Sequence, residues 1–450
     1  MYPTMRDASH ESTADATSVG PAQRSAAVSV AASIFNRAGI VVLNMGTGIL
    51  TARTLHPAGR GELTAMNLWP LFLANATALG TPSSLIFHLR KHAERRGELI
   101  ASALTMVTAL GVFAAIVGAF ALPHWLHEYP PDVVHFAQIF LIVAPFWAIQ
   151  ITGQAALEAL ELFSLSNLVQ IMIPVLTLTG LVTAFALGRM TPVVAAACYS
   201  SAIVPTALCI LAMLWRRRAG HVLRVSGTAC RTLLGYGLRS APLDLLGTLN
   251  LYIDQVLVIG LLTAAAMGSY AVVLSLSRAL LLFQSAVVMV LFPKAAGRSI
   301  DEILAMVGQA ARVGTLITAS AAVATMLLGQ GLLRLFYGAQ YLEAVPALEV
   351  LVLEVVVQGS VVVLSQAFMA AGRPGILSLL HATGLALAVP LMFVFIPRYG
   401  TMGAALALLC STAVRFCLIV GAVRFVLKRP VPRLWPGAGD VGRLWGLVRR

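Results

Sequence analysis

The sequence contains few charged residues for its length. Only 11% of its 450 residues are Asp, Glu, Lys or Arg, whereas 59% are hydrophobic. Soluble domains carry roughly 25% charged residues and avoid large exposed apolar patches. A chain with so little charge cannot cover its apolar side chains in water, which excludes a soluble globular protein. The apolar runs are continuous rather than alternating, which excludes a transmembrane β-barrel.

Motifs for catalysis and metal binding are also missing. The sequence has no GxxxxGK[ST] phosphate-binding loop, no HExxH and no GxSxG, which serve nucleotide hydrolysis, zinc proteolysis and ester hydrolysis. The five cysteines contain no CxxC pair, so neither a disulfide framework nor a zinc site is expected. We therefore expect no enzyme, no bound metal and no cofactor. Any energy would come from an ion gradient, the membrane potential or the substrate's own gradient.

The sequence is instead rich in long apolar segments. A membrane-spanning helix needs about 20 mostly apolar residues. A hydropathy window predicts such helices near 26–52, 63–88, 98–122, 134–157, 163–187 and 192–215, and again near 232–260, 264–292, 303–334, 343–370, 375–396 and 401–426. The predicted fold class is an all-α polytopic membrane protein with about twelve transmembrane helices in two pseudo-symmetric six-helix lobes.

The most basic loop separates the two sets of helices. It contains the run Arg216–Arg218, followed by Arg224 and Arg231. The predicted organisation is a cytoplasmic tail over 1–25, an N-terminal lobe over 26–215, a basic cytoplasmic linker over 216–231, a C-terminal lobe over 232–426 and a basic cytoplasmic tail over 427–450.

The net charge of +13 is explained by membrane topology. The Lys and Arg residues lie between the apolar runs and at the C-terminus, as the positive-inside rule requires, so we expect no nucleic-acid partner. Placing both termini in the cytoplasm puts most basic loops inside. The exceptions are mainly Arg53, Arg60, Arg189, Arg334 and Arg398.

Several ionisable residues fall within the predicted spans. Such side chains are costly in lipid and usually face a cavity or a partner. The candidates for a hydrated lumen are Arg37, Arg278, Arg415, Arg239 and Arg312, with the polar Asn44 on the Arg37 face of the first helix; the candidates for ion coupling or charge pairing are Asp254, Asp244 and Glu354. Two alternatives stay open. Arg239 and Arg312 lie near cytoplasmic ends, where they can snorkel to the interface, and neutral polar residues can serve helix packing alone.

The net charge of the predicted lumen indicates the class of substrate. Five candidate arginines outnumber three candidate acids. The guanidinium fork binds phosphate in a bidentate manner. A net cationic lumen therefore favours an anionic substrate over a cationic drug.

Local sequences across residues 26–426 resemble one transporter family. The segment Thr51–Leu63 is similar to the first external turn of the polysaccharide flippases, the Wzx-like branch of the superfamily that also contains MATE exporters and the lipid II flippase; the usual Gly before Pro57 is His56 here. Further similar segments are Leu238–Pro242, Tyr252–Gln255, Met267–Tyr270, Leu291–Lys294, Leu335–Tyr341 and Gly372–Pro374.

The resemblance implies a V-shaped molecule that alternates between inward-open and outward-open states in a bacterial cytoplasmic membrane. The implied cargo is an oligosaccharide on a polyprenyl pyrophosphate carrier, flipped for surface polysaccharide export. Arg37, Arg278 and Arg415 would contact the pyrophosphate, and Asp254 would orient an arginine or respond to protons. Besides this lipid-linked oligosaccharide and membrane lipids, the implied partners are a polysaccharide polymerase and export proteins.

Three other functions stay open at this point. A MATE-type antiporter of drugs or metabolites normally uses an acid in the first helix of a lobe; residues 26–52 contain Arg37 and no acid, although Asp244 and Asp254 fall in 232–260. A membrane enzyme such as a glycosyltransferase usually needs a large catalytic loop, and no predicted loop exceeds about 16 residues. A non-transporting scaffold is disfavoured by the charges within the spans.

Overall fold

A computed structural model describes residues 21–216, 224–285, 288, 291, 298–373 and 375–434, with side chains from residue 35 onward. Within these ranges the ordered elements are all helices, with no strand. Ten helices are long and apolar enough to cross a membrane. Their outward faces carry large apolar side chains, such as Phe35 (82% exposed), Phe120 (77%) and Leu327 (80%). Lipid is the solvent that such a surface requires, so the chain is a multi-pass membrane protein.

The described part of the first half of the chain contains seven α-helices. They are α1 (Pro21–Thr77), α2 (Thr81–Lys91), α3 (Arg96–Trp125), α4 (Pro131–Phe140), α5 (Ala144–Ala159), α6 (Phe163–Ala186) and α7 (Pro192–Arg216), with the short 3₁₀ turns η1 (Ala93–Arg95) and η2 (Leu141–Val143) between them.

The described part of the second half contains five α-helices. They are α8 (Gly227–Leu261), α9 (Ala264–Ala279), α11 (Ile300–Leu332), α12 (Val345–Ala370) and α13 (Gly375–Phe425), with the π-helical turn η3 (Leu333–Tyr337) and the 3₁₀ turn η4 (Ala339–Ala344) between α11 and α12. Each predicted span overlaps one or more of these helices.

The expected count of about twelve spans is not confirmed, because the described residues contain ten candidate spans. The helices α1 and α13 each continue through a range in which the sequence predicts two spans. Each is interrupted by one residue with non-helical backbone, His56 (φ 59°, ψ 177°) in α1 and Gly400 (φ 57°, ψ −133°) in α13. The predicted pairs of spans lie on either side of these two residues.

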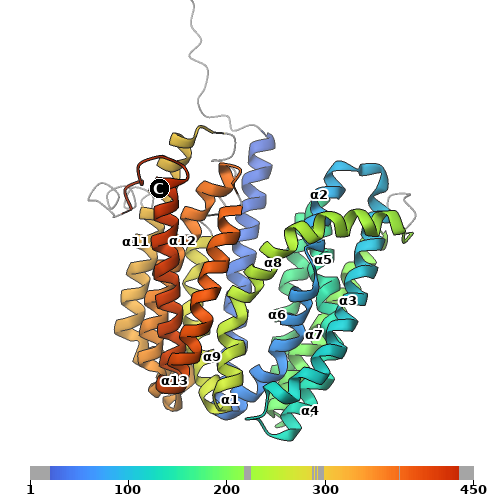
Figure 1. Ribbon diagram of the computed structural model, residues 1–450. Coiled ribbons are helices and arrows are strands. Elements are labelled where there is room, and N and C mark those ends of the chain that lie inside the picture. Colours follow the sequence, from blue (N-terminus) through green and yellow to red (C-terminus); the bar gives the residue numbers. More distant parts are fainter. Residues whose placement is uncertain are drawn as a thin grey trace, which may run out of the picture.

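The helices form two groups (Figure 1). Helices α2–α7 lie on one side of the molecule, and α9, α11, α12 and α13 lie on the other. The groups meet at the lower end of the view and stand apart at the upper end, near the last described residues. This arrangement agrees with a two-lobe architecture, and we refer to the groups as the N-lobe and the C-lobe. Helix α1 is counted with the N-lobe because it packs on α3–α7.

Helix α8 crosses between the lobes (Figure 1). Its first half packs on α2 of the N-lobe, where Ser84 Oγ donates to the Leu233 carbonyl at 2.9 Å. The backbones approach so closely that a Cβ on Gly80 would lie 2.3 Å from the Gly237 carbonyl oxygen. The second half of α8 joins the C-lobe, as described below.

The predicted domain boundaries stay predictions. In the N-terminal tail, residues 1–20 lie outside the described part, while 21–25 begin α1. In the linker, 217–223 lie outside it, and α8 begins at Gly227 rather than near 232. In the C-terminal tail, 435–450 lie outside it, as do Pro374 and the segment Phe292–Lys294 of the family resemblance.

Candidate functional site

A buried ion pair lies where α8 and α9 meet in the C-lobe. Asp254 of α8 is fully buried, and its Oδ2 lies 3.1 Å from Arg278 Nη2 of α9. The same oxygen accepts a hydrogen bond from the Tyr270 hydroxyl at 2.9 Å. Arg278 also donates to the Leu251 carbonyl at 3.1 Å, and its side chain is 28% exposed. Asp254 and the Leu251 carbonyl thus fix the orientation of the Arg278 guanidinium, whose side chain stays partly exposed.

A second arginine lies in the same lobe, and no carboxylate among the described residues bonds to it directly. Arg415 of α13 is 8% exposed and donates to Gln358 Oε1 at 2.7 Å, to Thr412 Oγ1 at 3.2 Å and to Asn250 Oδ1 at 3.3 Å. All three acceptors are neutral. The Arg415 Nε is buried with no hydrogen-bond partner among the described residues.

Glu354 connects the two arginines electrostatically. The Thr412 hydroxyl donates to Glu354 Oε1 at 2.7 Å, and Glu354 lies close enough to interact with both Arg278 and Arg415. The cluster thus contains two arginines and two acids. The arginine excess that the sequence predicts is therefore absent from this cluster, because Asp254 and Glu354 pack beside the cations.

The other predicted lumen residues lie elsewhere. Arg37 is exposed on α1 and Arg239 is exposed on α8, and neither contacts the C-lobe cluster in the described part. Arg312 of α11 donates to the Arg433 carbonyl at 2.7 Å, beside the C-terminal segment. Asp244 accepts a hydrogen bond from Ser83 of α2 at 3.0 Å. The structure therefore brings together Arg278, Arg415, Asp254 and Glu354, and it separates them from the remaining candidates.

The N-lobe contains a cavity of about 380 Å³. Asn44, the remaining sequence candidate, lies in its lining. The other lining residues come from α1, α5, α6 and α7: Ile40, Asn67, Pro70, Leu71, Trp147, Gln170, Ile173, Pro174, Thr177, Tyr199 and Ser200.

A chain of amide side chains continues from this cavity. Gln170 Nε2 donates to Ser166 Oγ at 3.2 Å, and Ser166 Oγ donates to Glu158 Oε1 at 3.0 Å. Glu158 also accepts from Gln154 at 2.9 Å. Sequence reasoning missed this network because neutral amides do not stand out among apolar residues. The sequence pattern that could have revealed this network is the spacing of Gln150, Gln154 and Glu158, which places all three on one helical face.

Hydrogen bonds join the lobes at the lower end of Figure 1, where α1 bends at His56. Arg53 donates to the carbonyls of Leu335 and Phe336 in η3, the latter at 2.8 Å. His56 Nδ1 lies 2.7 Å from Gln340 Oε1, and the Tyr341 hydroxyl donates to the Ala52 carbonyl at 3.0 Å. We call this set of contacts the inter-lobe latch.

Glycines allow a close backbone approach beside the latch. A Cβ on Gly268 of α9 would lie 1.9 Å from the Pro57 carbonyl oxygen, and one on Gly61 would lie 1.7 Å from that of Ala264. No other residue fits at such distances without movement of the backbone. The first turn of α9 is thereby packed directly on the bend of α1.

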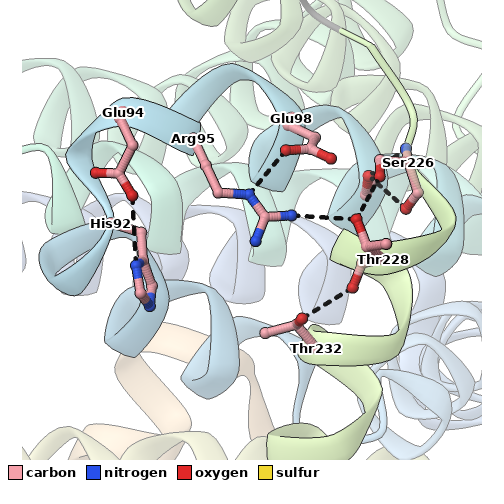
Figure 2. A network of polar contacts seen from close by, with 8 residues as sticks. His92, Glu94, Arg95, Glu98, Ser226, Thr228 and Thr232 are labelled. Carbon is pink, nitrogen blue, oxygen red and sulfur yellow. Dashed lines mark hydrogen bonds and ion pairs between the residues drawn. The ribbon is translucent and has the colours of Figure 1, made fainter.

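A polar network fixes the start of α8 to the N-lobe (Figure 2). Arg95 Nε donates to Glu98 at 2.9 Å, and Arg95 Nη2 donates to Thr228 Oγ1 at 3.2 Å. Thr228 and Ser226 share a further hydrogen bond of 2.8 Å. Arg95 thus connects η1 to the start of α8.

Comparison with known proteins identifies the family. Residues 50–346 match the family model described as polysaccharide biosynthesis protein. The chain belongs to this family. A search of curated proteins found no match.

Solved structures show the same fold at low identity. The lipid II flippase MurJ in an inward closed conformation has a TM-score of 0.75 and 14% identity, with 93% of this chain and 90% of that chain covered. An inward-facing multidrug resistance MATE transporter has a TM-score of 0.71 and 17% identity, with 86% and 94% covered. A MOP superfamily transporter from Pyrococcus furiosus, whose binding pocket is described as having reverse polarity, has a TM-score of 0.64 and 17% identity, with 89% and 94% covered.

These matches confirm the family resemblance and the fold class. The polysaccharide biosynthesis protein has the fold of membrane flippases and transporters, and its family and neighbours are not enzymes.

Proposed function

We propose that this polysaccharide biosynthesis protein flips a polyprenyl-pyrophosphate-linked oligosaccharide across the bacterial cytoplasmic membrane by alternating access. Both termini would lie in the cytoplasm, since that orientation places most basic loops inside. The family supports a role in polysaccharide synthesis. The observation that carries the substrate assignment is Arg415, a buried cation with only neutral hydrogen-bond partners.

The physical argument concerns the cost of burying a charge. Burying a cation in a low-dielectric site costs several kcal/mol after relaxation. The neutral acceptors Asn250, Gln358 and Thr412 offset part of this cost, and so does the neighbouring Glu354, which also interacts with Arg278. A pyrophosphate would add a direct ionic partner for Arg415, and the guanidinium fork suits its oxygens.

The remaining arginines contribute in different ways. The partly exposed Arg278 is oriented by Asp254 and would bind the same anion. Arg37 is exposed on α1, outside the cluster, and would meet the pyrophosphate at another stage of transport.

A MATE-type antiporter of drugs or metabolites is the second candidate, favoured by the shared fold. An organic cation needs an available carboxylate. In the C-lobe cluster, Asp254 is fully buried against Arg278, and Glu354 is bonded to Thr412 and lies near both arginines. The electrostatics therefore favour the anionic cargo.

The deciding experiment is a deletion strain. Its lipid extract is analysed by mass spectrometry for polyprenyl-pyrophosphate oligosaccharides. The proposal expects these intermediates to accumulate on the cytoplasmic side while the surface glycan disappears. An unchanged pool and an unchanged surface glycan, in a strain without a second flippase, would reject the proposal; sensitivity to cationic dyes would then favour the antiporter.

The same strain tests the arginines. Arg415→Ala and Arg278→Ala are expected to lower surface glycan at least tenfold, and Arg415→Lys to retain part of it because the charge stays while the fork is lost. Arg424→Ala, an exposed position on the same helix α13, is the matched control. Normal export by the Arg37→Ala, Arg278→Ala and Arg415→Ala variants, at wild-type protein levels, would show that the pyrophosphate assignment is wrong.

A further inference from the structure

The N-lobe cavity differs in chemistry from the C-lobe cluster. None of its lining residues is Asp, Glu, Lys, Arg or His. Its polar side chains are amides and hydroxyls: Asn44, Asn67, Gln170, Thr177, Tyr199 and Ser200. Such groups both donate and accept hydrogen bonds without carrying charge. A pyrophosphate would find no cation in this lining, and an organic cation would find no carboxylate.

The cavity also has unsatisfied hydrogen-bonding capacity. Asn67 Oδ1 accepts from Ser200 Oγ at 2.9 Å, while Asn67 Nδ2 is buried with no partner among the described residues. Pro174 lies within α6 and has no N–H to donate to the carbonyl of Gln170, four residues earlier. The wall of the cavity thus includes Asn67, whose amide donor has no partner in the described part of the chain. Buried groups of this kind cost free energy unless a ligand or water bonds to them.

Apolar groups complete the lining. The apolar lining residues include Trp147, Leu71 and Ile173, together with the rings of Pro70 and Pro174. Sugar rings have C–H faces that pack on aromatic rings and hydroxyl edges that bond to amides. The volume of about 380 Å³ falls within the range of ligand pockets, roughly 300–1,000 Å³. The size suits a short piece of a glycan rather than a whole polymer.

We propose that the N-lobe cavity binds an uncharged part of the glycan of the transported lipid-linked oligosaccharide. This inference rests on the proposed function and divides recognition between the lobes. Arg415 and Arg278 of the C-lobe bind the anionic pyrophosphate, whereas Asn67 and Gln170 of the N-lobe bind sugar hydroxyls. Asn44, which is exposed and lines the cavity, stands at its entrance.

The probe for this site is the glycan alone. Lipid-linked oligosaccharide is extracted from the deletion strain, and mild acid releases the free oligosaccharide without carrier or pyrophosphate. Its binding to the full-length protein in lipid nanodiscs is measured by calorimetry. Asn67→Ala and Gln170→Ala are expected to weaken binding at least tenfold. Thr179→Ala is the matched control, because Thr179 is exposed on α6 and its hydroxyl bonds to the Val175 carbonyl of its own helix.

A protection assay provides a readout in otherwise intact protein. Asn44→Cys is introduced into a background without the five native cysteines and is labelled with a maleimide. The released oligosaccharide is expected to slow labelling of Asn44→Cys at least fivefold and to leave Val42→Cys unaffected, since Val42 is 67% exposed but does not line the cavity.

The outcomes separate the inference from the proposed function. Accumulation of the lipid-linked pool, together with unchanged glycan affinity in both alanine variants and no protection of Asn44→Cys, would overturn the N-lobe site and leave the flippase function standing. Absence of the pool would reject the flippase function first, and the glycan site with it. Protection by an organic cation, but not by the glycan, would also overturn the site.

Discussion

At the residue scale, the position of Arg415 depends on a glycine. Gly384 and Arg415 belong to the same long helix, α13, on opposite sides of its interruption at Gly400. A Cβ on Gly384 would lie 2.3 Å from Arg415 Cδ and 3.0 Å from its Nε. The two halves of α13 thus pack at a glycine, and the arginine side chain lies across it.

This contact gives the first prediction. Gly384→Ala is expected to displace the Arg415 guanidinium from Gln358 and Asn250 and to lower surface glycan at least tenfold in a complemented deletion strain. Overpacking of this kind costs about 1–3 kcal/mol, so the melting temperature of the purified protein should fall only modestly. Gly421→Ala is the control on the same helix, because its added Cβ would meet only ordinary contact at 4.0 Å. Equal export by both variants would contradict the role given to this packing.

At the element scale, the bend of α1 positions the inter-lobe latch. Pro57 removes a backbone donor immediately after His56, whose φ of 59° ends the first straight portion of the helix. The Arg53, His56 and Ala52 groups on the bend then reach η3 and η4, while Pro57 contacts Gly268 of α9. One bend therefore supports both the hydrogen bonds and the backbone packing.

The second prediction tests this packing. Gly268→Ala places a Cβ 1.9 Å from the Pro57 carbonyl oxygen, so α9 and α1 must separate. Spin labels at Arg189 and Glu343, both exposed near this end, are expected to show longer and broader distances by electron double resonance. Gly331→Ala in α11 is the control, since nothing lies within 4 Å of its added Cβ. An unchanged distance distribution in Gly268→Ala would show that this approach does not hold the lobes together.

At the scale of the whole molecule, the two lobes are joined at the latch and connected by α8. The first half of α8 is bonded to the N-lobe through Leu233 and Thr228, and its second half to the C-lobe through Asn250 and Asp254. The proposed alternating access would require the latch to open while α8 bends or pivots. The N-lobe contacts of α8 extend to Asp244, which accepts from Ser83, so Gly247 is the glycine of α8 that lies between the two sets of contacts.

The third prediction tests whether the latch must open during transport. His56→Cys and Gln340→Cys, whose native side chains approach to 2.7 Å, are joined by a short bis-methanethiosulfonate in a background without native cysteines. Transport in vesicles is expected to fall below a tenth of its initial rate and to recover when the cross-link is reduced. Each single cysteine variant treated with the same reagent controls for labelling alone. Full transport by the cross-linked protein would mean that the lobes need not part at this end.

The amino-acid sequence by itself determined that the protein lies in a membrane, where its helices occur and which family it belongs to. Hydropathy is a property of consecutive residues, so the positions of the spans follow from the local apolar runs. The turn sequences around Pro57 and Gly268 identified the family for the same reason, because each motif is contiguous. The sequence also identified Arg278, Arg415, Asp254 and Glu354 as unusual, since charges within apolar runs need a partner.

Only the tertiary structure decided which of these residues meet. Arg415 is bonded to Asn250, 165 residues earlier, and His56 to Gln340, 284 residues later. Such contacts depend on how each helix is rotated and packed, which no local pattern specifies. For this reason the sequence grouped Arg37 with Arg278 and Arg415 and missed the amide-lined N-lobe cavity. Neutral amides become a site only when packing brings several helices around one space.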